Sequence, residues 1–189
     1  MNKPNDIGLV NAKEVAKAIQ LDKYGFIGTF IGWLLMKVLK ISTLNKFYKK
    51  HKHLKDIDFL DSILDEFKIK FEIPEEDLKR LPKEGAYITV SNHPLGGIDG
   101  ILLLKLMLEQ RDDFKIIANF LLHRIAPLKP YIMPVNPFED RKDVKSSIAG
   151  FKNSILHLRD GHPLGLFPAG EVSTYKDGKL VVDKPWEEA

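Results

Sequence analysis

His93 and Asp99 have the residue types of a general base and of the carboxylate that orients it. They stand in segment 90–100, which reads VSNHPLGGIDG. An aspartate that accepts a hydrogen bond from one ring nitrogen fixes the imidazole tautomer, and the other nitrogen can then take a proton from an attacking hydroxyl. The intervening glycines allow the tight turn that would return Asp99 to the ring. Taken alone, the segment would also fit a structural role, with Asn92 and Asp99 capping a turn and a helix.

A second segment, 133–143, reads MPVNPFEDRKD and runs from an apolar stretch into a long helical pattern. Arg141 would stand near the first turn of that helix. Free helix amides and a guanidinium can together hold a carboxylate or a phosphate in a fixed orientation. The segment therefore predicts an anion-binding site, although a surface arginine paired with Glu139 or Asp140 would have the same sequence.

A third segment, 166–173, reads LFPAGEVS and again follows an apolar stretch. Gly170 would let a substrate approach the backbone closely, where amides can polarise a carbonyl or hold an anion. Glu171 is a candidate partner for a hydroxyl or amide of the substrate. The alternative is a turn that carries a solvated acid.

Short apolar stretches alternate with helical patterns around these three segments. The predicted strands cover 86–90, 114–118, 131–135 and 163–167, and the predicted helices between them cover 98–110 and 143–159. Upstream, 57–67 has helical spacing and Pro74 precedes an acidic helix start. This alternation indicates an α/β domain, in which strand ends host sites.

The composition limits the chemistry and locates the charge. The 189-residue chain has the length of one domain and no cysteine, which excludes disulfides, thiolate catalysis and cysteine-bound zinc. Residues 1–55 contain 11 lysines and 3 acidic residues, a net charge of +8, within a formal net charge of +3 for the chain. The remainder is therefore acidic, with a net charge of −5.

The basic N-terminal arm also contains an uncharged apolar run, 24–36, which ends at Lys37 and continues as KVLKI over 37–41. It is shorter than the about 20 apolar residues of a spanning helix, and a polar segment precedes it, unlike a signal peptide. With the basic tract 46–55 it predicts an arm that contacts the membrane surface, where each basic residue contributes about 1 kcal/mol. The alternative is an amphipathic helix packed on the core. Nucleic acid is the competing partner for a basic arm, but the apolar run favours lipid and not nucleic acid.

The order and spacing of the three segments resemble the glycerolipid acyltransferase family, in particular the lysophosphatidic acid acyltransferases, over roughly 85–173. That family carries Asn-His, four residues and Asp, later Asp-Arg, and then Phe-Pro-Glu-Gly-Thr-Arg-Ser. The corresponding residues here are Asn92, His93, Asp99, Asp140, Arg141 and 167–173. The resemblance implies an α/β fold of the glycerolphosphate acyltransferase type, with a mixed sheet flanked by helices.

By this resemblance the chain is expected to be an enzyme that moves a fatty acyl group from an acyl carrier protein or coenzyme A thioester to a lysolipid hydroxyl. His93 would be the general base, Asp99 would orient it, and Arg141 would bind the acceptor's anionic group. The acceptor site would be completed by Gly170, Glu171 and Ser173. The thioester is a substrate, so no cofactor is implied. The remaining histidines are expected to be solvated or at helix ends and predict no metal site; they are His51, His53, His123, His157 and His162.

The chain departs from the family pattern at two places. Five residues separate His93 from Asp99, and a bulge at 96–97 would absorb the extra one. Ala169 and Val172 occupy the family's glutamate and arginine positions, so one partner for a phosphate is missing. These features resemble the branch that carries a hemolysin label and includes bacterial enzymes that O-acylate amino-acid lipids. The expected acceptor is lysophosphatidic acid or an N-acyl amino acid such as N-acyl glycine.

The predicted organisation has three parts: a membrane-contacting arm at 1–55, a helical connector at 56–84 and a catalytic domain at 85–189. Family members continue into a further strand after the third motif, so the chain is expected to be truncated at its C-terminus. The expected location is the cytoplasmic face of a membrane, as a peripheral or monotopic protein. Two alternatives remain, namely a non-catalytic lipid-binding membrane protein and an acyl-thioester hydrolase that uses water in place of the lipid hydroxyl.

Overall fold

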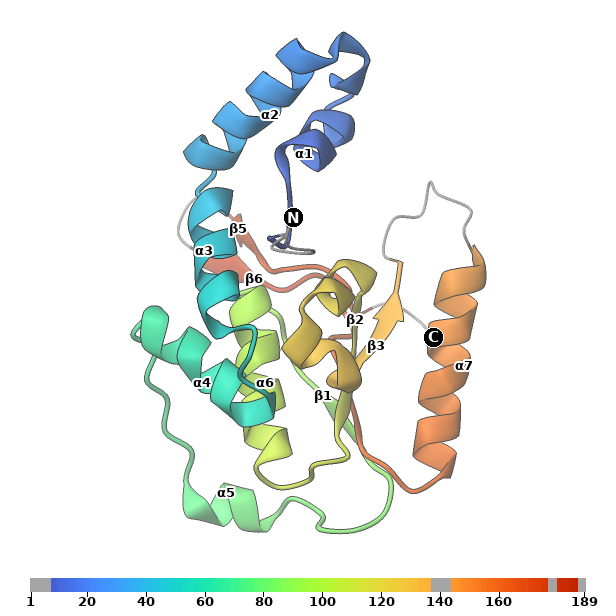
Figure 1. Ribbon diagram of the computed structural model, residues 1–189. Helices are drawn as coiled ribbons and strands as arrows, with labels where there is room; N and C mark the ends of the chain where they lie inside the picture. Colours follow the sequence, from blue (N-terminus) through green and yellow to red (C-terminus); the bar gives the residue numbers. More distant parts are fainter. Residues whose placement is uncertain (1–7, 137–143, 177–179, 187–189) are drawn as a thin grey trace. The chain divides into compact units, whose positions relative to one another are not determined.

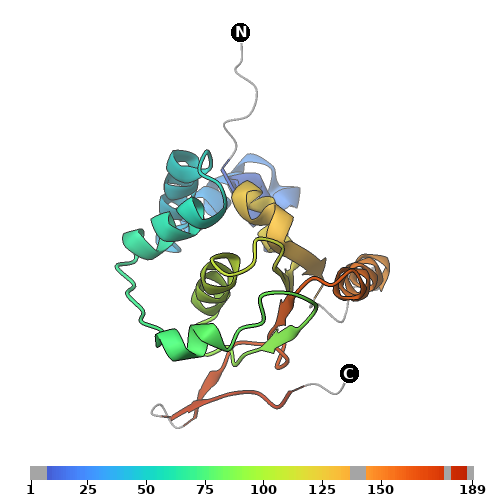
Figure 2. The same cartoon turned by 90° about the horizontal axis from the view of Figure 1, so that it is seen from below.

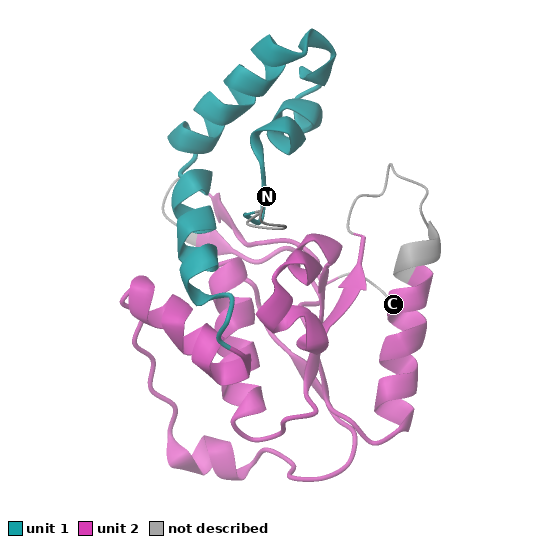
Figure 3. Cartoon of the chain, viewed as in Figure 1, with its two compact units in different colours: residues 1–54 teal, residues 55–189 magenta. Residues whose placement is uncertain are grey.

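The computed structural model describes residues 8–136, 144–176 and 180–186. The chain divides into two compact units, Met1–Leu54 and Lys55–Ala189 (Figure 3). The predicted connector, 56–84, therefore belongs to the same compact unit as the predicted catalytic domain.

The first unit consists of helices. They are α1 (Ala12–Ala18), the 3-10 turn η1 (Asp22–Tyr24), α2 (Phe26–Val38) and α3 (Ile41–His51). Asn11 begins α1 with a capping box, in which its side chain accepts from the Glu14 amide and Glu14 accepts from the Asn11 amide. Gly32 lets α2 pack against α1, because a Cβ there would lie 2.2 Å from the carbonyl oxygen of Ala12.

The uncharged run predicted over 24–36 lies in η1 and α2, and its continuation over 37–41 reaches only the first residue of α3. Lys40 has a φ of 56°, in the left-handed region, and the chain bends by 76° between α2 and α3. A residue in that region cannot continue a right-handed helix, so α2 and α3 are two separate helices and not one continuous helix. Among the described residues no single helix has the length and hydropathy to cross a bilayer, whereas α2 and α3 taken together meet those two criteria.

The second unit is built on a parallel sheet. Its strands are β1 (Ile88–Val90), β2 (Lys115–Asn119), β3 (Ile132–Val135) and β4 (Leu164–Leu166), in the spatial order β1-β4-β2-β3. The helices of this unit are α4 (Asp56–Glu66), α5 (Glu75–Lys79), α6 (Gly97–Leu108) and α7 (Val144–Arg159), with 3-10 turns η2 (Phe120–Arg124) and η3 (Ala126–Tyr131). A separate antiparallel hairpin follows, formed by β5 (Thr174–Lys176) and β6 (Leu180–Val182). The α/β class and the four predicted strands are confirmed.

The strand order explains where the helices lie. The connection from β1 to β2 through α6 runs in one direction along the sheet, and the connection from β3 to β4 through α7 runs back. Right-handed crossovers then require α6 and α7 on opposite faces, as Figures 1 and 2 show. All four strands are parallel, and the connection from β2 to β3 passes through η2 and η3. The predicted mixed sheet is wrong for these strands, since antiparallel pairing among the described residues is confined to the β5–β6 hairpin.

Close packing on both faces holds the sheet rigid. On one side, Phe59 and Leu60 of α4 and Met107 of α6 are fully buried. On the other side, Gly150 lets α7 lie directly on β3, since a Cβ there would stand 2.2 Å from the carbonyl oxygen of Pro134. Such close-packed layers resist changes of volume and fix the strand ends.

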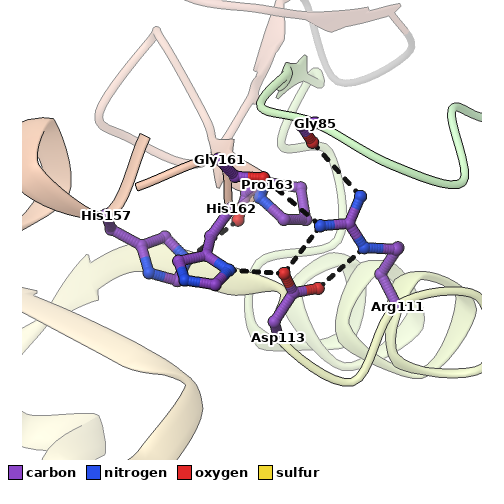
Figure 4. Close-up of polar contacts among 7 residues, drawn as sticks. All are labelled: Gly85, Arg111, Asp113, His157, Gly161, His162 and Pro163. Atoms are coloured by element: carbon purple, nitrogen blue, oxygen red, sulfur yellow. Dashed lines mark hydrogen bonds and ion pairs between the residues drawn. The ribbon is translucent and has the colours of Figure 1, made fainter. Parts of the chain in front are cut away.

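A polar network joins the amino ends of β1, β2 and β4 (Figure 4). Asp113 accepts from Nε and Nη2 of Arg111 at 2.8 and 2.6 Å and contacts Nδ1 of His162 at 2.6 Å. Arg111 also donates to the carbonyl oxygens of Gly85 and Gly161. The hydrogen bonds from Arg111 are the main cause that lowers the pKa of Asp113 to about 2. His157, expected to be solvated or at a helix end, is instead buried against His162, and this burial lowers its pKa.

We expect Asp113→Asn to lower the free energy of unfolding by roughly 2 kcal/mol at neutral pH, at about 1.4 kcal/mol per pKa unit. The pKa of Asp113 is depressed in the folded state, so this stability is present above the unfolded value of 3.8 and is lost as pH falls toward about 2. Urea unfolding of both proteins at pH 7 and pH 3 would measure the difference. The exposed neighbour Asp112, changed to Asn, is the matched control. A difference that stays constant between the two pH values would contradict this assignment.

Candidate active site

The carboxyl ends of β1 and β4 bring two of the predicted motifs together. Val90 pairs with Leu166 in the parallel register, and the amide of Ser91 donates to the carbonyl oxygen of Leu166 at 3.3 Å. The chain that carries His93 and the loop that begins at Phe167 therefore leave the sheet side by side. Carboxyl ends of parallel strands are the usual place for a site in an α/β sheet.

His93 and Asp99 are in contact in this structure. Nδ1 of His93 lies 3.2 Å from Oδ2 of Asp99, and the two side chains are 19% and 14% exposed. The distance is short enough for a hydrogen bond, but the direction of the contact does not complete one, and Nδ1 is buried without a hydrogen-bond partner among the described residues. Hydrogen bonds in active sites are often poorly aligned before substrate binds, so this geometry is compatible with a hydrogen bond that forms in the presence of substrate.

The turn between the two residues accommodates the extra residue of this chain. Gly96 has a φ of +63°, in the region that glycine adopts without strain, and it precedes the first turn of α6. The amide of Leu95 donates to Oδ2 of Asp99 at 2.7 Å, so the same carboxylate oxygen faces both the turn and the imidazole. His93 and Asp99 thus meet although five residues separate them.

The third motif contacts His93 from the other side. The ring of Phe167 stacks on the imidazole, with centroids 4.1 Å apart and planes 22° apart. The amide of Ser173 donates to the carbonyl oxygen of His93 at 3.0 Å. Residues 167–173 therefore hold both the side chain and the backbone of the candidate base. The sequence identified this segment but did not assign Phe167 a role.

The other predicted residues of the third motif, Gly170, Glu171 and Ser173, form hydrogen bonds or ion pairs with other residues of the chain. The amide of Gly170 donates to the carbonyl oxygen of Phe167 at 3.0 Å, so it is not a free donor for a substrate. Glu171 is 67% exposed and pairs with Lys184 at 2.8 Å. The hydroxyl of Ser173 donates to Asp183. Their binding roles remain predictions, and the structure shows that Glu171 and Ser173 attach this loop to residues after β6.

The structure also shows the surroundings of Ala169 and Val172, the two residues that distinguish this chain from the family pattern. Ala169 is buried, so the position of the family's glutamate offers no acid here. A Cβ on Gly96 would lie 3.4 Å from Cγ2 of Val172, which puts this valine beside the His93 to Asp99 turn. Arg141 lies outside the described residues, and its predicted anion-binding role stays a prediction.

Comparison with known proteins identifies the family of this chain. The chain belongs to the acyltransferase family, whose model matches residues 14–189. It is 29% identical over 182 residues to a lyso-glycine lipid O-acyltransferase of Bacteroides thetaiotaomicron, covering 95% of this chain. It is 30% identical over 186 residues to the protein of the same name from Phocaeicola vulgatus, covering 97% of this chain. The chain spans 63% of the length of each of these relatives. No solved structure matches it.

Proposed function

We propose that this protein is an O-acyltransferase that moves a fatty acyl group from a thioester to the hydroxyl of a lysolipid. One observation carries the proposal, namely the 3.2 Å contact between His93 and Asp99 at the carboxyl end of a parallel sheet, in a chain of the acyltransferase family. The pair has the residue types and the partial burial that a general base and its orienting carboxylate need.

The proposed reaction needs no covalent enzyme intermediate. The acceptor hydroxyl oxygen attacks the thioester carbonyl carbon while its proton passes to Nε2 of His93, and Asp99 stabilises the resulting imidazolium. The tetrahedral intermediate then re-forms the carbonyl and breaks the carbon–sulfur bond. The leaving thiolate takes the proton from Nε2, which returns His93 to its neutral form. The products are an esterified lipid and a free thiol.

The negative oxygen of the tetrahedral intermediate requires hydrogen-bond donors. Because the Gly170 amide is already bonded to Phe167, we assign this role to other amides of the same loop. The amides of Glu171 and Val172 have no backbone acceptor within the described part of the chain, and they directly follow Gly170, whose φ is +63°. They are the candidate donors.

For the acceptor we propose a lysolipid with one carboxylate, of the kind named in the relatives, ahead of lysophosphatidic acid. A phosphate monoester carries more charge than a carboxylate and gains more from a second guanidinium. This chain has Val172 where the family pattern has an arginine, and Arg141 is the remaining arginine of the two motifs. The proposed donor is an acyl carrier protein or coenzyme A thioester, with no cofactor.

The product separates the proposed reaction from its alternatives. The protein, reconstituted on vesicles, would be incubated with a long-chain acyl thioester and equal amounts of lyso-glycine lipid and lysophosphatidic acid, and the lipids would be analysed by mass spectrometry. The proposal expects the diacyl glycine lipid to exceed phosphatidic acid. Free fatty acid alone would indicate a thioester hydrolase. Tight lipid binding without turnover would indicate a non-catalytic lipid-binding protein.

We also propose that the first unit attaches the protein to the cytoplasmic face of a membrane as a peripheral or monotopic domain. Large apolar side chains of α2 are exposed, with Phe26 84% and Phe30 51% accessible to solvent. Trp33 is also exposed and packs against Phe30, and Lys37 lies over its ring at 4.0 Å. An apolar surface with an aromatic ring and basic residues at its border suits the interface between headgroups and acyl chains.

We expect the double variant Phe26→Ser, Phe30→Ser to bind vesicles with anionic lipid at least 10-fold more weakly, since each buried Phe contributes about 1.5–3 kcal/mol. Sedimentation with vesicles of phosphatidylcholine and phosphatidylglycerol would measure the bound fraction. Phe67→Ser, an exposed phenylalanine of the second unit, is the matched control. Equal binding by the double variant and the unchanged protein would rule out α2 as the attachment surface.

A further inference from the structure

We propose that Phe167 is a positioning residue for His93, holding the plane of the imidazole and stabilising the imidazolium that forms during proton transfer. The inference rests on the proposed function for its catalytic consequence, but its structural part stands on the stacked geometry alone. The third motif, residues 167–173, would then position His93 in addition to binding the acceptor, the role that its sequence predicts.

The contact with Asp99 leaves the orientation of the imidazole incompletely determined. That contact restrains Nδ1 at a distance of 3.2 Å but does not complete a hydrogen bond, and the structure gives Nδ1 no other partner among the described residues. A single contact at one ring atom leaves the ring free to tilt about that atom. A flat surface against the ring removes this freedom, and Phe167 supplies one at a centroid distance of 4.1 Å.

The stack also suits the charge that develops during the reaction. When His93 takes the proton of the acceptor hydroxyl, the ring becomes a cation that lies over the face of an aromatic side chain. The face of an aromatic ring is negative and attracts a cation at this distance. Asp99 approaches the ring edge at Nδ1 while Phe167 covers a ring face, so the two residues stabilise the imidazolium from different directions.

The backbone explains why Phe167 can hold this position. It follows β4 directly, and the β4 register places Leu166 beside Val90 at the end of β1. From the other end of the loop, the Ser173 amide holds the carbonyl oxygen of His93. Phe167 is thus attached to a sheet strand on one side of the loop, while the loop returns to His93 itself. Because the loop backbone is held at both ends, the Phe167 side chain loses little further conformational entropy when it packs on the imidazole.

The test compares Phe167→Leu, which removes the aromatic face, with Phe167→Tyr, which keeps it. Phe151→Leu, at an exposed phenylalanine of α7, is the matched control. We expect Phe167→Leu to lower kcat about 10-fold with KM within twofold of the original value, as loss of a partly buried cation–π contact predicts. Phe167→Tyr and Phe151→Leu should stay within twofold in both constants.

Nuclear magnetic resonance of the His93 ring protons supplies a readout that needs no turnover. Stacking on Phe167 should shift these resonances upfield through the ring current, and Phe167→Leu should move them back while Phe167→Tyr keeps them. Unchanged resonances and unchanged kcat in Phe167→Leu would overturn the inference. A Tyr variant as slow as the Leu variant, with a raised KM in both, would also overturn it, because it would place Phe167 against substrate. If the unchanged protein forms no ester, the proposed function fails while the resonances still decide whether the stack exists.

Discussion

His93→Ala is expected to lower kcat for acyl transfer by about 10²–10⁴-fold, the contribution that a general base typically makes. The acceptor hydroxyl would then have to lose its proton to water during attack. KM for both substrates should change little, because the imidazole acts on the proton and not on the lipid chain or the thioester. Initial rates of ester formation at saturating acceptor would measure the loss.

The fold should survive this substitution, because His93 lies in a loop after β1 and its side chain is only partly buried. Thermal unfolding of the variant would check this point. His53→Ala, which removes an exposed histidine of the basic tract, is the control for the loss of a histidine as such. A His93→Ala protein that is folded and retains activity within threefold would remove His93 from the mechanism.

Asp99→Asn is expected to lower kcat by about 10- to 100-fold, less than the loss of His93 itself. Oδ2 of Asp99 makes both the contact with Nδ1 of His93 and the hydrogen bond from the Leu95 amide. An amide oxygen in the same place can keep both contacts, so the substitution mainly removes the negative charge. Hydrogen bonds to a charged group contribute about 1.5–3 kcal/mol, which corresponds to this range of rates.

A comparison with Asp99→Ala separates charge from position. The alanine variant also loses the acceptor for the Leu95 amide, so the turn that carries His93 is no longer held and kcat should fall further. Asp65→Asn, on the exposed side of α4, is the control for removing a carboxylate elsewhere in the unit. If Asp99→Asn and Asp65→Asn have the same rate, then Asp99 does not act on His93.

The regular elements of the second unit were predictable because their periodicity follows directly from burial. Apolar stretches over 114–118 and 131–135 became β2 and β3 within one residue at each end, and the spacing over 143–159 became α7. The contact between His93 and Asp99 was predictable as well, since a strand end followed by glycines brings a nearby carboxylate back toward the ring. These features depend on neighbours in sequence.

Other features depend on contacts between distant residues, and no local pattern predicts them. Phe167 meets His93 only because β4 pairs with β1, which follows from the strand order. His157 is buried because the chain after α7 returns beside Asp113, and from the sequence alone it resembled a helix-end histidine. The break at Lys40 is a backbone conformation that a lysine in an apolar run does not signal.

The function itself is most directly tested by following the acyl carbon. The protein on vesicles would receive a long-chain thioester labelled with ¹³C at the carbonyl, together with lyso-glycine lipid, and the label would be located by mass spectrometry. The label is expected to move to an ester carbonyl of the lipid, with equimolar release of thiol and loss of transfer in His93→Ala. Label that remains in the thioester, or that is recovered only as free fatty acid, from a folded and membrane-bound protein would contradict it.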